Sequence, residues 1–167
     1  MKKTVFVLVS LFLTLLQVTY TYKICIGGYN YGLMFTAVIV LTTFDATSGY
    51  ISAFLCGFFM DCLLGGANLM YLLICMFAAF VTHMFSKLAL RQGLLSVLLL
   101  TFVLTFFTEL IQFWLFIARE ESGLIAFALK NIIFPQAFIN SFMSVFVYCL
   151  YAWIWRRYYM EKGGHSH

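Results

Sequence analysis

The chain has 167 residues, of which 64% are hydrophobic and only 10% are charged, and its mean hydropathy is +1.00. This composition excludes a water-soluble globular domain and is typical of a protein embedded in a lipid bilayer. The formal net charge is only +4 at pH 7. An excess of Lys and Arg in the cytoplasmic connections of a membrane protein accounts for this charge, so no nucleic-acid partner is expected.

Six apolar stretches follow one another along the chain, and most approach the roughly 20 residues that a helix needs to cross about 30 Å of hydrocarbon. They cover residues 4–20, 31–44, 48–64, 69–85, 94–118 and 132–155. We therefore expect an all-α integral membrane protein, with a single domain over residues 1–167 built as a bundle of about six transmembrane helices. The second stretch has only about 14 residues and could instead be a tilted or re-entrant segment.

The first stretch also resembles the start of a secretory signal, because Lys2 and Lys3 precede an apolar run. Cleavage requires small residues at the end of such a run, whereas Tyr20, Tyr22 and Lys23 stand there. We therefore expect an uncleaved first helix.

The distribution of Lys and Arg predicts the orientation, since short cytoplasmic connections carry an excess of both. With six spans and the amino terminus inside, seven basic residues fall inside and three outside. The inner ones are Lys2, Lys3, Lys87, Arg91, Arg156, Arg157 and Lys162, and the outer ones are Lys23, Arg119 and Lys130. Both termini are therefore expected in the cytoplasm, although models with five spans and one end outside stay open.

The connections are too short for a soluble domain. The longest covers residues 119–131, and its apolar run at 124–129 predicts a short helix lying on the outer membrane surface. The five cysteines are isolated from one another in sequence, and His165 and His167 on a glycine-bearing tail offer too few fixed ligands for a metal. No metal or cofactor is expected.

The third stretch carries small residues at every fourth position, followed by one acid. The series is Gly49, Ala53, Gly57, Asp61 and Gly65. Small residues along one edge of a helix let another helix approach closely, and an intramembrane acid is costly unless it has a partner or reaches water. The series therefore predicts an edge that docks a helix, with a partner protein as the expected occupant.

Other polar residues are expected in the outer half of the bundle, on the fifth and sixth stretches. We expect Asp61, Glu109, Gln112 and Asn140 to line a shared polar zone near Pro135, where the last span begins. The alternative is that each polar group is satisfied locally by a neighbouring hydroxyl or carbonyl group.

Catalytic motifs are absent from the chain. Neither G-x-S-x-G nor H-E-x-x-H occurs, and Asp61 and Glu109 do not form a paired acid motif. No enzymatic activity and no catalytic residue are therefore expected.

The block at residues 57–65, from Gly57 through Asp61 to Gly65, resembles the signature of the rod shape-determining protein MreD family. Leu16 and Gln17 at the end of the first span, and a last helix that opens on Pro135 and carries Asn140, extend the resemblance. One position departs from it, because family members usually carry a glycine where Leu69 stands here.

The resemblance implies a non-catalytic component of the bacterial cell-elongation machinery in the cytoplasmic (inner) membrane. Its implied partners are an MreC-like bitopic membrane protein and, through it, the peptidoglycan transpeptidase and polymerase. The implied fold is similar to that of the substrate-binding subunits of energy-coupling-factor vitamin transporters. Such a subunit is the alternative function, in which the polar zone would hold a small ligand instead of a partner helix or a membrane lipid.

Overall fold

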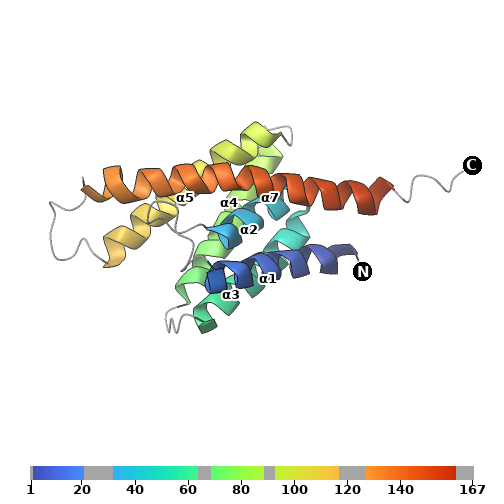
Figure 1. Ribbon diagram of the computed structural model, residues 1–167, viewed down its shortest axis with the longest axis horizontal. Coiled ribbons are helices and arrows are strands. Elements are labelled where there is room, and N and C mark those ends of the chain that lie inside the picture. The colour runs from blue at the N-terminus through green and yellow to red at the C-terminus, as the bar shows by residue number, and fades with distance from the viewer. Residues whose placement is uncertain (1, 21–31, 64–68, 89–92, 117–126, 161–167) are drawn as a thin grey trace, which may run out of the picture.

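The computed structural model describes residues 2–20, 32–63, 69–88, 93–116 and 127–160, and these are almost entirely helical (Figure 1). In chain order the elements are α1 (Lys2–Tyr20), α2 (Leu33–Phe44), α3 (Ala46–Leu63), α4 (Met70–Leu88), α5 (Leu94–Phe116), the π-helix η1 (Leu129–Ile133) and α7 (Phe134–Met160). The expectation of an all-α fold is confirmed for this part of the chain.

The shortest α-helix, α2, occupies the centre of the bundle. Its sequence is apolar on every side, which is typical of a helix surrounded by other helices, and every residue from Met34 to Thr42 is buried. It packs against α1, α3, α4, α5 and α7. Its 12 residues extend about 18 Å, which is less than the thickness of the hydrocarbon. Because protein surrounds it, α2 need not reach both membrane surfaces.

Four helices are long and apolar enough to cross a membrane, at Ala46–Leu63, Met70–Lys87, Leu94–Trp114 and Leu129–Arg157. The apolar helices at Thr4–Thr19 and Leu33–Phe44 are shorter. The six predicted stretches thus correspond to four full-length candidate spans and two shorter apolar helices.

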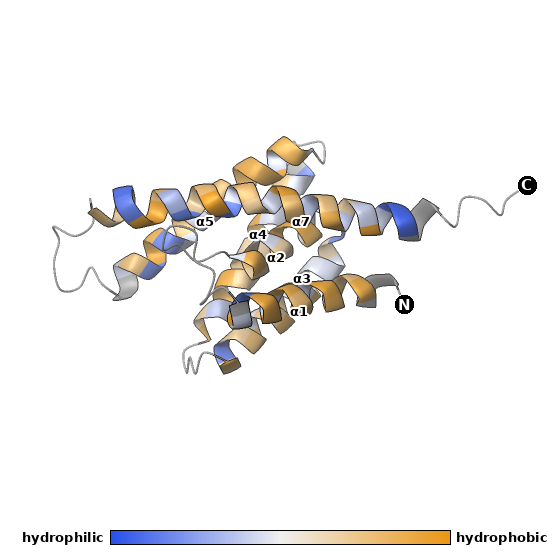
Figure 2. Cartoon of the chain, in the orientation of Figure 1, coloured by the Kyte–Doolittle hydropathy of each residue, from blue (hydrophilic) through white to orange (hydrophobic). Residues whose placement is uncertain are grey.

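The surface of the bundle is apolar, as a lipid environment requires. Large apolar side chains are exposed on every long helix, among them Phe12, Phe58, Leu73, Leu99 and Phe142. Figure 2 shows hydrophilic residues concentrated towards the two ends of the long helix that η1 and α7 form, with hydrophobic residues dominating between them. In water such a surface would cause aggregation, whereas in a bilayer it contacts the acyl chains.

The start of α1 and the end of α7 lie at the same end of the molecule (Figure 1). The ring of Trp155 lies 5.6 Å from that of Phe6 on α1 and 5.7 Å from that of Phe44 at the end of α2. Between α1 and α7, the hydroxyls of Ser10 and Tyr151 are hydrogen bonded at 2.6 Å.

The start of the last helix differs from the expectation. Residues 127–133 are helical and continue directly into α7, so the part of the predicted surface helix that the structure describes is not a separate element. The π-helical turn η1 ends two residues before Pro135, whose nitrogen cannot donate a hydrogen bond and whose ring would clash with a regular α-helical turn before it. The wider turn lets the helix continue through Pro135, so the last helix does not begin at this proline.

Candidate functional site

The helix α3 has one face of small residues and one face of large ones. Its buried side is Ser48, Gly49, Ser52, Ala53, Cys56, Gly57, Met60 and Asp61. Its exposed side carries Ile51, Phe54, Leu55, Phe58, Phe59 and Leu63. The predicted small-residue edge is therefore a protein-facing surface, as is typical of helices that pack closely in membranes.

The helices that pack on this edge belong to the same chain. A Cβ atom added at Gly57 would lie 2.7 Å from the Cα atom of Leu72 and 2.9 Å from the carbonyl oxygen of Tyr71, both on α4. A Cβ atom added at Gly49 would lie 2.6 Å from the Cα atom of Thr42 on α2. Gly65 lies outside the described residues.

These contacts correct the prediction that a helix of another protein docks on the edge. The prediction requires the edge to be free, whereas α4 occupies it at Gly57 and α2 occupies it at Gly49. The sequence pattern indicated close helix packing, and it could not indicate which helix is packed there.

Asp61 caps the amino terminus of α4. Its Oδ1 atom accepts a hydrogen bond of 3.1 Å from the backbone N–H of Tyr71, and its Oδ2 atom accepts one of 2.9 Å from that of Leu72. These N–H groups belong to the first turn of α4, where no helical carbonyl is available to them. In hydrocarbon, such unsatisfied groups are costly, so the acid of α3 completes the start of α4.

A comparison with α3 shows why α4 needs a cap from elsewhere. The start of α3 is capped locally, because Asp45 accepts a hydrogen bond of 3.2 Å from the N–H of Ser48 and a second bond from the Ser48 hydroxyl. At the start of α4 the equivalent position is Leu69, which has no side-chain acceptor. Leu69 also has a φ of 50°, a left-handed conformation that favours glycine.

Two further side chains satisfy the start of α2 in the same way. The Oδ1 atom of Asn140 on α7 accepts a hydrogen bond of 2.8 Å from the N–H of Gly32. The Oε1 atom of Gln17 on α1 accepts one of 2.7 Å from the N–H of Met34. The N-cap residue Gly32 has no side chain, so the short central helix depends on α1 and α7 for its capping.

Glu109 has a different kind of partner. Its Oε1 atom accepts a hydrogen bond of 2.7 Å from Nε2 of Gln136, which joins the end of α5 to the start of α7. Gln112 is half-buried one turn later on α5, and Pro135 is half-buried beside Gln136.

The predicted polar zone is therefore divided. Glu109 and Asn140 both lie where α7 meets its neighbours, whereas Asp61 bonds to α4 and lies on a helix that packs against α1, α2 and α4. The alternative of local satisfaction applies to Asp61 and Asn140, although their partners are backbone N–H groups and not hydroxyls or carbonyls. Sequence reasoning missed Gln136 as the partner of Glu109, because the spacing of 27 residues carries no periodic signal.

Both α4 and α5 carry buried hydroxyl groups. Within the described part of the chain, the hydroxyls of Thr82, Thr101 and Thr105 are fully buried and have no hydrogen-bond partner. By contrast, the hydroxyl of Ser141 on α7 donates to the carbonyl of Leu98 on α5 at 2.9 Å. These threonines contribute small volume to the helix contacts, as small residues do in membrane bundles.

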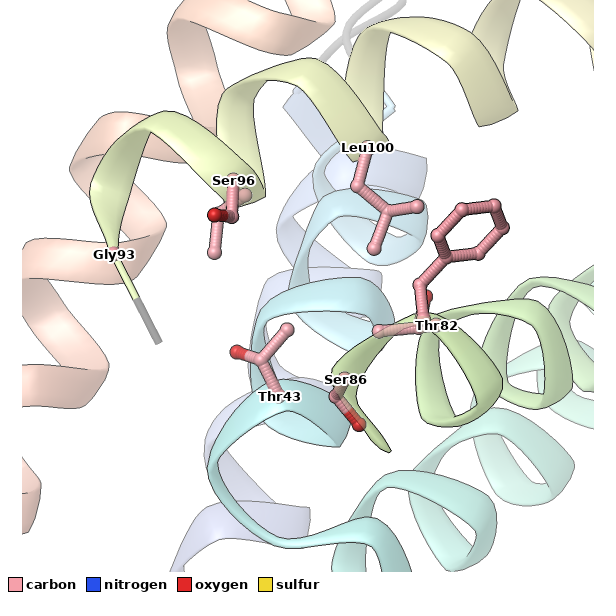
Figure 3. Close-up of a pocket in the computed structure, with 8 residues that line it drawn as sticks. Thr43, Thr82, Ser86, Gly93, Ser96 and Leu100 are labelled. Carbon is pink, nitrogen blue, oxygen red and sulfur yellow. The ribbon is translucent and has the colours of Figure 1, made fainter. Parts of the chain in front are cut away.

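One groove lies at the end of the bundle where α1 begins. Thr43 of α2, Thr82 and Ser86 of α4, and Ser96 and Leu100 of α5 surround it (Figure 3). Its cavity volume is about 20 Å³, room for about one water molecule. It lies at the opposite end of the helices from Glu109 and Asn140.

No protein-family model matches this chain, and neither a curated protein nor a solved structure is significantly similar to it.

Proposed function

We propose that the chain is a non-catalytic subunit of the bacterial cell-elongation machinery, similar to MreD, which holds an MreC-like bitopic protein in the cytoplasmic membrane. Through that protein it would act on the peptidoglycan transpeptidase and polymerase. The proposal rests on the sequence resemblance and on what its residues do in the structure.

The observation that carries the proposal is the shared role of the three polar residues in the resemblance. Gln17, Asp61 and Asn140 each accept backbone N–H groups from the start of another helix. The resemblance is thus supported at positions that are far apart in the sequence.

The one departure from the resemblance gives further support. Family members usually carry a glycine where Leu69 stands, and the backbone there has the positive φ that glycine adopts most easily. The local conformation at the start of α4 therefore fits a family in which glycine is the usual residue.

The alternative, a vitamin-type substrate-binding subunit, has less support. Small-molecule sites enclose roughly 300–1,000 Å³ and combine an apolar lining with a few polar groups. The groove beside Thr82 has a cavity volume of about 20 Å³ and lies away from the polar end of the bundle. This groove, within the residues that the structure describes, therefore has no room for a vitamin-sized ligand.

The test is co-expression with the MreC-like bitopic protein of the same organism, followed by purification in mild detergent and identification of the proteins and small molecules that elute together. The proposal predicts recovery of the bitopic protein and rounded cells when the chain is depleted. Recovery of a bound vitamin, without the bitopic protein, would support the transporter alternative and contradict the proposal.

A further inference from the structure

One side of α7 is an exposed apolar stripe that ends in two arginines. Large side chains are exposed along it at spacings of three or four residues, which keeps them on one face of the helix. They are Phe134, Phe138, Phe142, Phe146, Leu150 and Trp153. The next exposed residues are Arg156 and Arg157, and this end of α7 is hydrophilic (Figure 2). A single helix face therefore joins an apolar surface to a basic end.

The length of the stripe places the arginines at the depth of the lipid headgroups. At 1.5 Å per residue, the stripe from Phe134 to Trp153 extends about 28 Å. This length is close to the roughly 30 Å of hydrocarbon in a bilayer. Arg156 and Arg157 follow directly after it, so their guanidinium groups can reach the phosphate groups of adjoining lipids while the stripe contacts acyl chains.

Trp153 positions one of the two arginines. The guanidinium carbon of Arg157 lies 5.5 Å from the centre of the Trp153 ring, within the range of a cation–π interaction. This contact orients the guanidinium group without neutralising it, and leaves its N–H donors available to an anion. Trp155, two residues later, instead packs against Phe6 and Phe44 inside the bundle. Trp153 is thus the tryptophan that α7 turns towards lipid at this depth.

Acidic side chains do not neutralise this basic end within the described part of the chain. The acids that the structure describes are Asp45, Asp61 and Glu109, and each accepts a hydrogen bond elsewhere in the bundle. The sequence after α7 adds one acid and one lysine, so the charge of this end stays positive. The positive charge at the end of the stripe is therefore available to a negatively charged ligand.

We propose that Trp153, Arg156 and Arg157 form a binding site for one anionic phospholipid. The two guanidinium groups donate to its phosphate oxygens, and Trp153 lies beside its glycerol region. One acyl chain follows the apolar stripe past Leu150 and Phe146. Phosphatidylglycerol binds better than phosphatidylcholine, because the choline group carries a positive charge that the arginines repel. The site does not depend on the proposed function.

Native mass spectrometry of the full-length protein in detergent, titrated with equal amounts of phosphatidylglycerol and phosphatidylcholine, tests the site. The wild type should retain one phosphatidylglycerol in preference to phosphatidylcholine. Arg157→Gln should lower the retention of phosphatidylglycerol about fivefold, as expected for loss of one basic residue at a membrane surface. Arg157→Lys keeps the charge but loses the paired donors, so its retention should fall less.

Lys87→Gln is the matched control. It removes the same charge from an exposed lysine, in the last turn of α4 and away from the stripe. Its retention of phosphatidylglycerol should equal that of the wild type.

Tryptophan fluorescence in vesicles provides a second measurement that does not depend on detergent. The chain has three tryptophans, so Trp114→Phe and Trp155→Phe leave Trp153 as the single emitter. In vesicles of equal parts phosphatidylglycerol and phosphatidylcholine, bromine on the acyl chains of phosphatidylglycerol should quench Trp153 more than bromine on those of phosphatidylcholine. Combining Arg156→Gln with Arg157→Gln should remove this difference.

Two results would overturn the proposal. Equal retention or equal quenching by the two lipids in the wild type would show that α7 does not select an anionic lipid. Equal losses of phosphatidylglycerol in Arg157→Gln and Lys87→Gln would show that total charge, and not a site on α7, governs binding. Either result leaves the proposed function standing, because that function is tested by recovery of the bitopic protein.

Discussion

The Oδ2 atom of Asp61 lies 2.9 Å from the backbone nitrogen of Leu72, so a side chain of α3 completes the first turn of α4. Directly beside this bond, Gly57 leaves space for the backbone of α4. Close approach and capping therefore act at one contact, because the carboxyl group can reach the N–H groups only when no side chain separates the two helices. Asp61, which the sequence suggested as a functional-site residue, therefore caps a helix of its own chain.

Replacing Asp61 tests the cap. Asp61→Leu removes both acceptors and is expected to lower the free energy of unfolding by about 2 kcal/mol or more, since single helix caps contribute about 0.5 to 2 kcal/mol. Asp61→Asn keeps one acceptor oxygen and should lose about half as much. Unfolding of the purified protein by titration with SDS in mild detergent measures both. A leucine variant as stable as the wild type would show that the cap contributes nothing.

Gly57 tests the close approach. Gly57→Ala places a Cβ atom 2.7 Å from the Cα atom of Leu72, so the helices must separate, at a cost of about 1 to 3 kcal/mol. Cys62→Ala is the control, since Cys62 lies exposed on the same helix. Thermal unfolding in detergent should show a lower midpoint for Gly57→Ala alone. Equal midpoints for the two variants would mean that α3 and α4 are not in contact at Gly57.

Leu69 offers a substitution that should stabilise the protein. A residue with a side chain loses roughly 1 to 2 kcal/mol in the left-handed region, and Leu69 has a φ of 50°. Leu69→Gly should therefore raise the unfolding free energy by about 1 kcal/mol. Leu73→Gly, one turn later within α4, should lower it by about the same amount. Destabilisation by both substitutions would contradict the backbone conformation at Leu69.

The start of α2 depends on Gln17 and Asn140 together. Each of Gln17→Leu and Asn140→Ala leaves a backbone N–H group without its acceptor and should cost about 1 to 2 kcal/mol. The double variant should cost less than the sum, because loss of either bond already loosens the same turn. A double-mutant cycle in SDS titrations measures the coupling, and strict additivity would show that the two bonds act independently.

Much of the fold follows from the sequence because apolar run length and small-residue spacing are local properties. The runs at residues 48–64, 69–85 and 94–118 predicted α3, α4 and α5 to within a few residues of their described ends. Pro135 predicted the start of the last helix, whereas the π-helical turn η1 continues that helix on the N-terminal side of the proline. The sequence also indicated that Gly57 and Asp61 face protein.

The partners of these residues could not be predicted, because they depend on which helices are neighbours. The bond of Asn140 to Gly32 spans 108 residues, and that of Glu109 to Gln136 spans 27. The central position of α2 could not be predicted either, because an apolar run of its length fits a tilted span, a re-entrant segment or a buried helix equally well. A helix surrounded by its own chain has the same composition as one surrounded by lipid.

Backbone amide exchange by NMR in lipid nanodiscs can detect whether buried polar side chains cap helices of their own chain. In the wild type, the N–H groups of Tyr71 and Leu72 should exchange slowly. Asp61→Leu should accelerate exchange at these two positions by about tenfold or more, and should leave Met34 unchanged because Gln17 holds its N–H group. Unchanged exchange at Tyr71 and Leu72 in Asp61→Leu would show that the carboxyl group of Asp61 does not hold these N–H groups.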